Sequence, residues 1–351
     1  MSGWRELLRK GWRSKGVRGA LIGTLVLGAL SGYALYSLLR KDMPGVNLGQ
    51  LVDRIGIGMF LVAGLVYAGD LALAIIGWGW IVGTLGEIWD WPQHFRIYCI
   101  TSVTRRLPGT MWYMLGRIVM YERLRVARSV TAIAGGVEFA TTILGGLLVA
   151  IITWPIALSG RQINPLWFVA GLLLGGLLIN PPILRAVLRR VSPQSAPLDL
   201  RYRHLFGWML LYACVWCGGG GVLYVLANTI HPLPLTMLAT LIGIWATSGL
   251  VSMLLSFIPF GLGIQELALS ALLAPYVGGP EAIVIALLMR GVLTINEVLW
   301  ALIAGLLGLT GLLRAGQNKQ IVTLSPISAI GLSEAKNSEE LYEPAAVIPP
   351  K

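Results

Sequence analysis

Residues 55–82 read IGIGMFLVAGLVYAGDLALAIIGWGWIV, and this stretch decides the class of the protein. It exceeds the roughly 20 apolar residues that cross the hydrocarbon core of a bilayer, and Asp70 is its one charged side chain. Other apolar stretches of similar length occur along the chain. The predicted spans are Gly19–Leu39, Ile55–Val82, Ser129–Thr153, Leu166–Leu188, Leu205–Thr229, Leu235–Phe257 and Val292–Leu313. We therefore predict an all-α, polytopic helical membrane bundle of about 7–8 spans.

The composition agrees with this class and argues against a soluble domain. Hydrophobic residues make up 56% of the 351 residues, and charged residues make up 12%. A soluble domain carries about 25% charged residues. The net charge of +11 does not indicate nucleic-acid binding, because no basic stripe with interleaved aromatic residues occurs. We expect no nucleic-acid partner.

Basic residues gather in alternate loops between the predicted spans. They precede the first span and follow the second and the fourth, and the main ones are Arg5, Arg9, Lys10, Arg13, Lys15, Arg18, Arg96, Arg105, Arg106, Arg117, Arg123, Arg125, Arg128, Arg185, Arg189, Arg190, Arg201 and Arg203. Loops rich in Lys and Arg stay in the cytoplasm. We expect a multi-pass protein of the plasma membrane with a cytoplasmic N-terminus.

The same patterns divide the chain into segments of different character. Residues 1–18 form a basic cytoplasmic N-terminal segment, and residues 19–313 form the transmembrane domain. Residues 314–351 are rich in Ser, Glu, Pro and Lys, a composition typical of a disordered polar tail.

Two stretches are apolar but too broken to cross as single helices. The first, His94–Arg128, is interrupted by Arg105-Arg106-Leu107-Pro108-Gly109. The second, Pro259–Arg290, holds the short apolar segments Ile264–Ala274 and Ala282–Met289 around a Pro- and Gly-rich turn. Paired half-length helices predict one or two re-entrant helical hairpins, which need protein or a cavity around them. The alternative is an amphipathic helix on the membrane surface.

An acidic residue recurs after both breaks. Glu138 precedes a Gly-Gly-Leu-Leu sequence, and Glu297 precedes an Ala-Gly-Leu-Leu sequence. Paired interrupted segments in the two halves of a chain are typical of transporters, whose binding site lies between the halves. We therefore consider an internal duplication of the transmembrane domain.

The first break gathers the candidates for lipid-phosphate binding, Arg105, Arg106 and Arg117. The helix that follows Pro108 and Gly109 begins with N–H groups that have no intrahelical acceptor. Such a helix start together with guanidinium groups favours a phosphate site. The alternative is that these arginines only set the topology.

Ionisable residues inside apolar segments cost about 2.5–3.5 kcal/mol each on insertion, so each needs a reason. Arg290 and Glu297 share a face if one helix continues through Gly291, either as a structural clamp or as part of a site. Glu266 can also be explained as a carboxylate in the first turn of a helix. The candidates for polar contacts in a cavity are Glu138, Glu266, Arg290, Glu297 and Asp70. The backbone breaks expected to line that cavity are Pro108, Gly109, Pro259, Gly261 and Gly263.

Catalytic residues are not indicated. The chain has three His and three Cys, without a zinc, metalloprotease or nucleophile motif. Cys214 and Cys217 spell CxxC inside an apolar helix, where small packing residues explain them. We expect no enzyme activity, no cofactor and no metal.

The two breaks resemble motifs of the lysylphosphatidylglycerol synthase transmembrane-region family. RLPGTMW at residues 106–112, followed by Gly116 and Arg117, resembles the family's R-x-x-P-G-x-x-W…G-R stretch. PFGLGIQE at residues 259–266 resembles its P-G-G-L-G-x-R-E signature, with Phe260 in place of a glycine and Gln265 in place of the arginine. The likeness covers Val17–Leu313. It implies a flippase-like membrane domain without the aminoacyl-transfer domain, in which Glu138 and Glu297 lie at acidic positions of the family.

The leading hypothesis is therefore a flippase-like protein that binds or translocates a phospholipid or a polyprenyl-phosphate-linked lipid. One alternative is a membrane-embedded glycosyltransferase with a lipid-phosphate donor, for which Asp42 and Asp53 are the available acidic pair. Another is a non-transporting partner of a membrane lipid or cell-envelope synthase. The expected partners are membrane lipids, either anionic phospholipid or lipid-linked sugar, together with a second copy of the chain or a membrane synthase.

Overall fold

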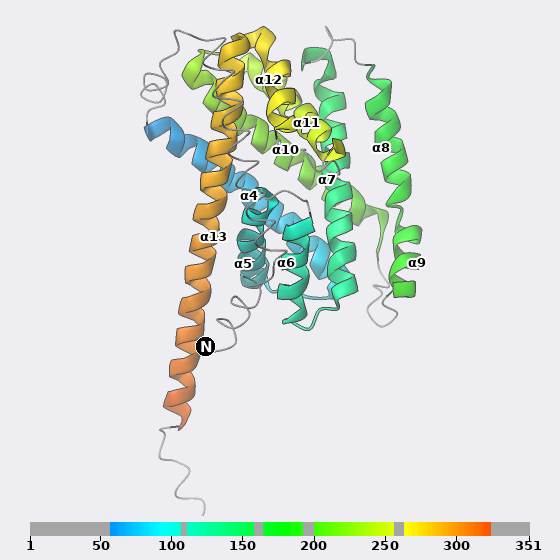
Figure 1. Ribbon diagram of the computed structural model, residues 1–351. Helices are drawn as coiled ribbons and strands as arrows, with labels where there is room; N and C mark the ends of the chain where they lie inside the picture. Colours follow the sequence, from blue (N-terminus) through cyan, green and yellow to red (C-terminus); the bar gives the residue numbers. More distant parts are fainter. Residues whose placement is uncertain (1–56, 107–110, 158–163, 192–199, 256–262, 324–351) are drawn as a thin grey trace, which may run out of the picture. The chain divides into compact units, whose positions relative to one another are not determined.

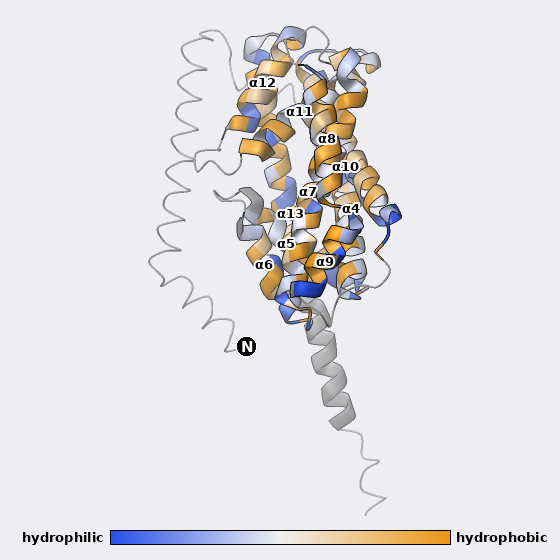
Figure 2. Ribbon diagram, turned by 90° about the vertical axis from the view of Figure 1, so that its right-hand side faces the viewer, coloured by the Kyte–Doolittle hydropathy of each residue, from blue (hydrophilic) through white to orange (hydrophobic). Residues whose placement is uncertain are grey.

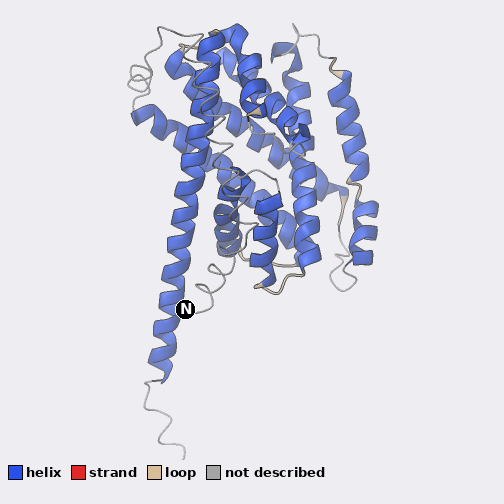
Figure 3. Ribbon diagram, in the orientation of Figure 1, coloured by secondary structure: helices blue, strands red, loops and turns tan. Residues whose placement is uncertain are grey.

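A computed structural model of the protein describes residues 57–106, 111–157, 164–191, 200–255 and 263–323. Every regular element among these residues is a helix (Figure 3). The long helices are α4 (Ile57–Gly86), α7 (Arg128–Ala157), α10 (Tyr202–Ile230), α11 (Leu238–Leu255) and α13 (Gly279–Thr323). The short ones are α5 (Trp91–Ser102), η1 (Val103–Arg106), α6 (Met111–Glu122), α8 (Leu166–Leu178), α9 (Pro181–Val191), η3 (Leu235–Met237) and α12 (Ile264–Val277). Figure 1 labels the α-helices.

Five helices in the described part of the chain are long and apolar enough to cross a membrane. Their spanning parts are Gly58–Gly86, Arg128–Ala157, Tyr202–Ile230, Leu235–Leu255 and Gly279–Gly308. The predicted class of an all-helical membrane protein is therefore confirmed in its coarse form. The predicted first span, Gly19–Leu39, lies outside the described residues, and the count of 7–8 spans stays a prediction.

The predicted span Leu166–Leu188 is not one straight helix. It consists of α8 and α9, which are bent by 45° where they meet. Pro181 and Pro182 lack the N–H groups that would continue the helical hydrogen bonds, so α8 ends and a new helix begins. The last turn of α9 is basic and appears among the hydrophilic segments in Figure 2.

The first predicted break separates two short helices. α5 and α6 are each 12 residues long, too short to cross a bilayer, and they pack against each other. Helix α6 also packs on α7, and the three helices lie close together in Figure 1. Residues 107–110 lie outside the described part. A re-entrant depth for this hairpin stays a prediction.

Of the two short helices predicted within the second stretch, Pro259–Arg290, only the first is a separate helix in the structure. Helix α12 is a separate short helix, as expected, and Gly278 turns the chain after it with φ of +95°. The expected second half-helix, Ala282–Met289, is wrong, because α13 continues from Gly279 through Gly291 without interruption. Pro280 does not break this helix because it lies in its first turn, where a missing N–H costs nothing.

Helix α10 lies against α4, α7 and α11, and its glycines explain the close contact. A Cβ at Gly220 would lie 2.5 Å from the Cα of Ile242 on α11. A Cβ at Gly145 of α7 would lie 2.7 Å from the backbone nitrogen of Ala213 on α10. The glycine run at 218–221 lies within the continuous helix α10 and permits this close packing.

Packing divides the chain into two compact units, Met1–Ala304 and Gly305–Lys351. The helices described above, up to Ala304 of α13, belong to the first unit. In the second unit the helix runs on to Thr323, past residue 314 where we expected the polar tail to begin. Residues 324–351 lie outside the described part.

We predict that Gly145→Ala lowers the thermal stability of the purified protein. The new methyl group meets backbone atoms of α10, which cannot rotate away, and overpacking of this kind costs about 1–3 kcal/mol. The matched control is Gly136→Ala in the same helix, where a Cβ has no atom within 4 Å. Equal unfolding temperatures for the two variants would contradict the close contact of α7 and α10.

Candidate functional site

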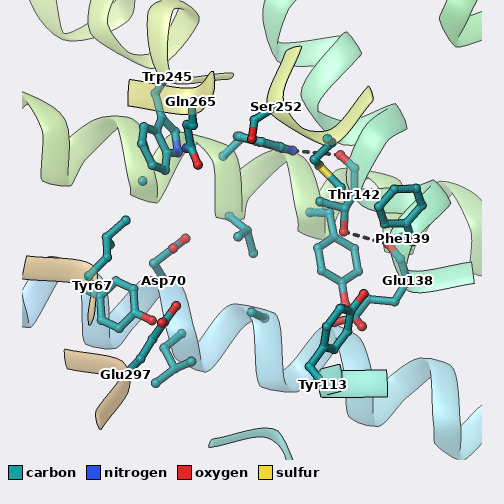
Figure 4. A pocket seen from close by; sticks show the side chains of 18 of the residues that line it. Tyr67, Asp70, Tyr113, Glu138, Phe139, Thr142, Trp245, Ser252, Gln265 and Glu297 are labelled. Carbon is teal, nitrogen blue, oxygen red and sulfur yellow. Dashed lines mark hydrogen bonds between the residues drawn. The ribbon is translucent and has the colours of Figure 1, made fainter. Parts of the chain in front are cut away.

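A cavity of about 350 Å³ opens between the helices of the first unit. This volume falls in the range of small-molecule sites, roughly 300–1,000 Å³. Every long helix and the short helices α5, α6 and α12 contribute to its wall (Figure 4). The lining residues are Tyr67, Asp70, Leu71, Ala74, Tyr98, Tyr113, Glu138, Phe139, Thr142, Tyr212, Val215, Trp216, Gly219, Trp245, Ser252, Met253, Gln265, Leu293 and Glu297.

Three of the acids singled out in the sequence meet in this cavity. They are Asp70 of α4, Glu138 of α7 and Glu297 of α13. Figure 4 shows Asp70 and Glu297 towards one end, with Tyr67, and Glu138 with Tyr113 towards the other. None of the described residues that line the cavity is Lys, Arg or His. The wall is therefore acidic and aromatic.

Glu138 is held by a buried ion pair with Arg117 of α6. Nη1 of Arg117 donates to Oε2 of Glu138, and the Tyr212 hydroxyl donates to Oε1 over 3.2 Å. Nε of Arg117 donates to the Thr101 hydroxyl over 3.3 Å. The side chains of Arg117 and Glu138 are 0% and 5% exposed. The pair therefore joins α6 to α7, with α5 and α10 as further partners.

Aromatic rings surround the Arg117 guanidinium. Its Cζ lies 4.1 Å from the ring centroid of Trp78, 4.3 Å from that of Tyr98 and 5.2 Å from that of Tyr113. Nη2 has no hydrogen-bond partner in the described part of the chain. Cation–π attraction to several rings, worth about 2 kcal/mol or more when desolvated, offsets part of the cost of burying this charge.

A series of hydrogen bonds holds the Trp78 ring in place against the Arg117–Glu138 pair. Its Nε1 donates to the Tyr121 hydroxyl over 2.8 Å, and that hydroxyl lies 2.6 Å from Nδ1 of His94. Nε2 of His94 lies 3.1 Å from the Ile88 carbonyl oxygen, so Nε2 carries the proton and Nδ1 accepts. Burial lowers the pKa of His94, which keeps this ring neutral. The Trp78 ring cannot turn away from Arg117 without breaking its hydrogen bond to Tyr121.

Arg290 has a different partner from the one we expected. Its Nη1 donates to Oε1 of Glu266 over 2.7 Å, so the proposed clamp with Glu297 is wrong for this arginine. Glu266 lies in the first turn of α12, as predicted, and that turn faces Arg290 on α13. Glu297 instead lines the cavity.

The remaining sequence candidates are placed only in part. Arg105 and Arg106 form the end of η1, and their side chains are not described. Gly263 precedes α12 with φ of +99°, which explains a glycine there. Pro108, Gly109, Pro259 and Gly261 lie outside the described residues. Phosphate binding by Arg105, Arg106 and Arg117 stays a prediction, and the structure places Arg117 in the buried pair.

Most of the aromatic side chains that line the cavity were not predicted from the sequence. Tyr212 and Trp216 are four residues apart on α10, so they share a face. Tyr67 and Asp70 are three residues apart on α4, which also places them on one face. This spacing was visible in the sequence, but apolar neighbours on every side of these helices hid which face is the wall. His94 was missed because nothing in its neighbourhood marks it as buried.

The described residues contain no group of three or more His, Cys, Asp or Glu side chains that could hold a metal ion. Asp70, Glu138 and Glu297 share the cavity but do not converge as ligands. Comparisons with known protein families, with curated proteins and with solved structures find no match to this chain.

We predict that Arg117→Met strongly destabilises the protein, because it leaves Glu138 buried without its cation. Breaking a buried pair costs about 3–5 kcal/mol, whereas replacing both partners can be nearly neutral. Thermal unfolding in detergent should show Arg117→Met as the least stable variant and the Arg117→Met/Glu138→Gln double variant as partly rescued.

The matched control is the Arg128–Glu122 pair, whose side chains are 71% and 44% exposed. Arg128→Met should leave the unfolding temperature unchanged, because exposed pairs contribute little. A wild-type unfolding temperature for Arg117→Met would show that the buried pair does not stabilise the bundle.

Proposed function

We propose that this protein binds the polar headgroup of a membrane lipid in the cavity and moves it between the two leaflets, as a flippase does. The lipid is a phospholipid or a polyprenyl-phosphate-linked lipid, and the movement needs no covalent chemistry. The protein lies in the plasma membrane with its N-terminus in the cytoplasm.

The observation that carries this proposal is a cavity lined by three carboxylates, between helices that are long enough to cross the membrane. Ionisable residues in such helices are costly, and they mark substrate pathways when they face a cavity. Asp70, Glu138 and Glu297 come from three different spanning helices and meet in one cavity. A headgroup needs such polar contacts when it leaves water, because lipid tails offer none.

The short helices support the same function. Helices α5, α6 and α12 all contribute to the wall of the cavity, and transporters commonly build substrate sites from interrupted helices. Helix α6 follows the Arg105–Arg106 pair. These two arginines would attract the lipid phosphate at the cytoplasmic side, and α5 with α6 would form a re-entrant hairpin beside the cavity. The resemblance to the lysylphosphatidylglycerol synthase transmembrane-region family favours the same reading.

We predict that Asp70→Asn and Glu297→Gln each slow lipid movement at least about tenfold while the protein stays folded. Each change keeps the size of the side chain and removes a negative charge from the cavity. The measurement is the transfer of fluorescently labelled lipids across proteoliposomes, tested with several headgroups. Glu122→Gln is the matched control, because Glu122 lies outside the cavity and is 44% exposed. Absence of lipid movement by the wild-type protein for every headgroup would refute the proposed function.

A further inference from the structure

We infer that the cavity selects a zwitterionic phospholipid headgroup, with its ammonium group at the Asp70–Glu297 end of the cavity and its phosphate at Arg290. This inference rests on the proposed function, because it names the class of lipid that the cavity takes. Phosphoethanolamine is the simplest headgroup of this class.

The Asp70–Glu297 end has the chemistry of an organic-cation site. Carboxylates attract an ammonium group, and the faces of Tyr and Trp rings attract it as well. Tyr67 and Trp245 line the cavity together with these two acids, and Figure 4 shows all four towards the same end. At the other end, Glu138 is paired with Arg117.

The lining also discriminates against other ligands. A metal ion needs several ligands that converge on one point, and the described residues form no such group. A headgroup that carries only a phosphate would bring its negative charge among carboxylates in a poorly screened environment, where repulsion is strong. An ammonium group removes this penalty.

Arg290 lies next to the cation end of the cavity. A small void of about 10 Å³, room for about one water molecule, is lined by Arg290 and Glu266. It shares the wall residues Trp245, Gln265 and Leu293 with the large cavity. The void beside the Arg290–Glu266 pair therefore adjoins the large cavity across these side chains.

Arg290 has the donors that a phosphate needs. One N–H of its guanidinium binds Glu266, and its side chain makes no other hydrogen bond in the described part of the chain. A guanidinium carries five N–H donors, so the others remain for phosphate oxygens, to which arginine binds in bidentate fashion. The Arg290 side chain is 35% exposed.

Helix α13 sets the separation of the two charges. Arg290, Leu293 and Glu297 follow one face of this helix, since they are spaced by three and four residues. The rise from Arg290 to Glu297 is about 10 Å, and both side chains are long enough to shorten the gap. One helix therefore presents a cation for the phosphate and an anion for the ammonium group of the same lipid.

The test is binding of two short-chain lipids to the purified full-length protein by titration calorimetry. Dihexanoylphosphatidylethanolamine should bind at least about tenfold more tightly than dihexanoylphosphatidylglycerol. The Arg290→Gln/Glu266→Gln variant, which leaves no unpaired acid, should bind the ethanolamine lipid about tenfold more weakly. Arg290→Lys keeps the charge but loses the bidentate donors, so its affinity should lie between that of the wild-type protein and that of the double variant. The control is the Arg128→Gln/Glu122→Gln variant, which removes an exposed pair on another surface.

Two results would overturn the inference. Phosphoglycerol lipid could bind as tightly as phosphoethanolamine lipid, or the loss of Arg290 and Glu266 could leave the affinity for phosphoethanolamine lipid unchanged. If the phosphoglycerol lipid is bound and also moved in proteoliposomes, the proposed function stands and only the headgroup assignment fails. If the protein neither binds nor moves these two lipids or a lipid with any other headgroup, both the headgroup assignment and the proposed function fail.

Discussion

The ion pair between Arg117 and Glu138 is the interaction on which the rest of the site depends. The pair is almost fully buried, and it joins Arg117 of α6 to Glu138 of α7. The residues in contact with it come from three more helices: Trp78 of α4, Tyr98 and Thr101 of α5, and Tyr212 of α10. Helices α5 and α6 are too short to be held by the bilayer alone. The pair fixes them to the spanning helices, and through them it positions the Tyr98 and Tyr113 side of the cavity.

The arrangement of charges follows from the cost of burial. A carboxylate in an apolar bundle needs a cation, a hydrogen-bond donor or a polar cavity. Glu138 has Arg117 and Tyr212, and Glu266 has Arg290. Asp70 and Glu297 face the cavity. Glu266 is thus held in an ion pair away from the large cavity, whereas Asp70, Glu138 and Glu297 line it.

Much of the fold could be predicted from the sequence, because membrane spans are recognised by length and apolarity alone. The ends of α4, α7 and α10 fall within a few residues of the predicted limits. The bend between α8 and α9 and the continuity of α13 could not be predicted in the same way. Prolines stand near both places, and whether a proline breaks a helix depends on its position in the first turn, which only the folded chain defines.

The acids that line the cavity stand out in the sequence, whereas the partners in the ion pairs do not. Asp70, Glu138 and Glu297 stood out because ionisable residues are rare in spanning segments. The pairing of Arg117 with Glu138 and of Arg290 with Glu266 depends on contacts between helices, and sequence spacing favoured Glu297 as the partner of Arg290 instead. The aromatic wall was hidden because Tyr and Trp are common in membrane helices for other reasons, such as the interfacial belt.

We propose that the cavity is open to water and receives a lipid headgroup. The most direct measurement is the reaction of Ser252→Cys with a small water-soluble thiosulfonate, in protein whose native cysteines are replaced by serine. Ser252 lines the cavity, whereas Ser248, one turn away on the same helix, is fully buried and serves as the matched position. We predict that Ser252→Cys reacts much faster than Ser248→Cys. We also predict that at least one of two short-chain phospholipids, a phosphatidylethanolamine and a phosphatidylglycerol, slows the reaction at Ser252→Cys. Equal reaction rates at the two positions, or a rate at Ser252→Cys that neither lipid slows, would contradict it.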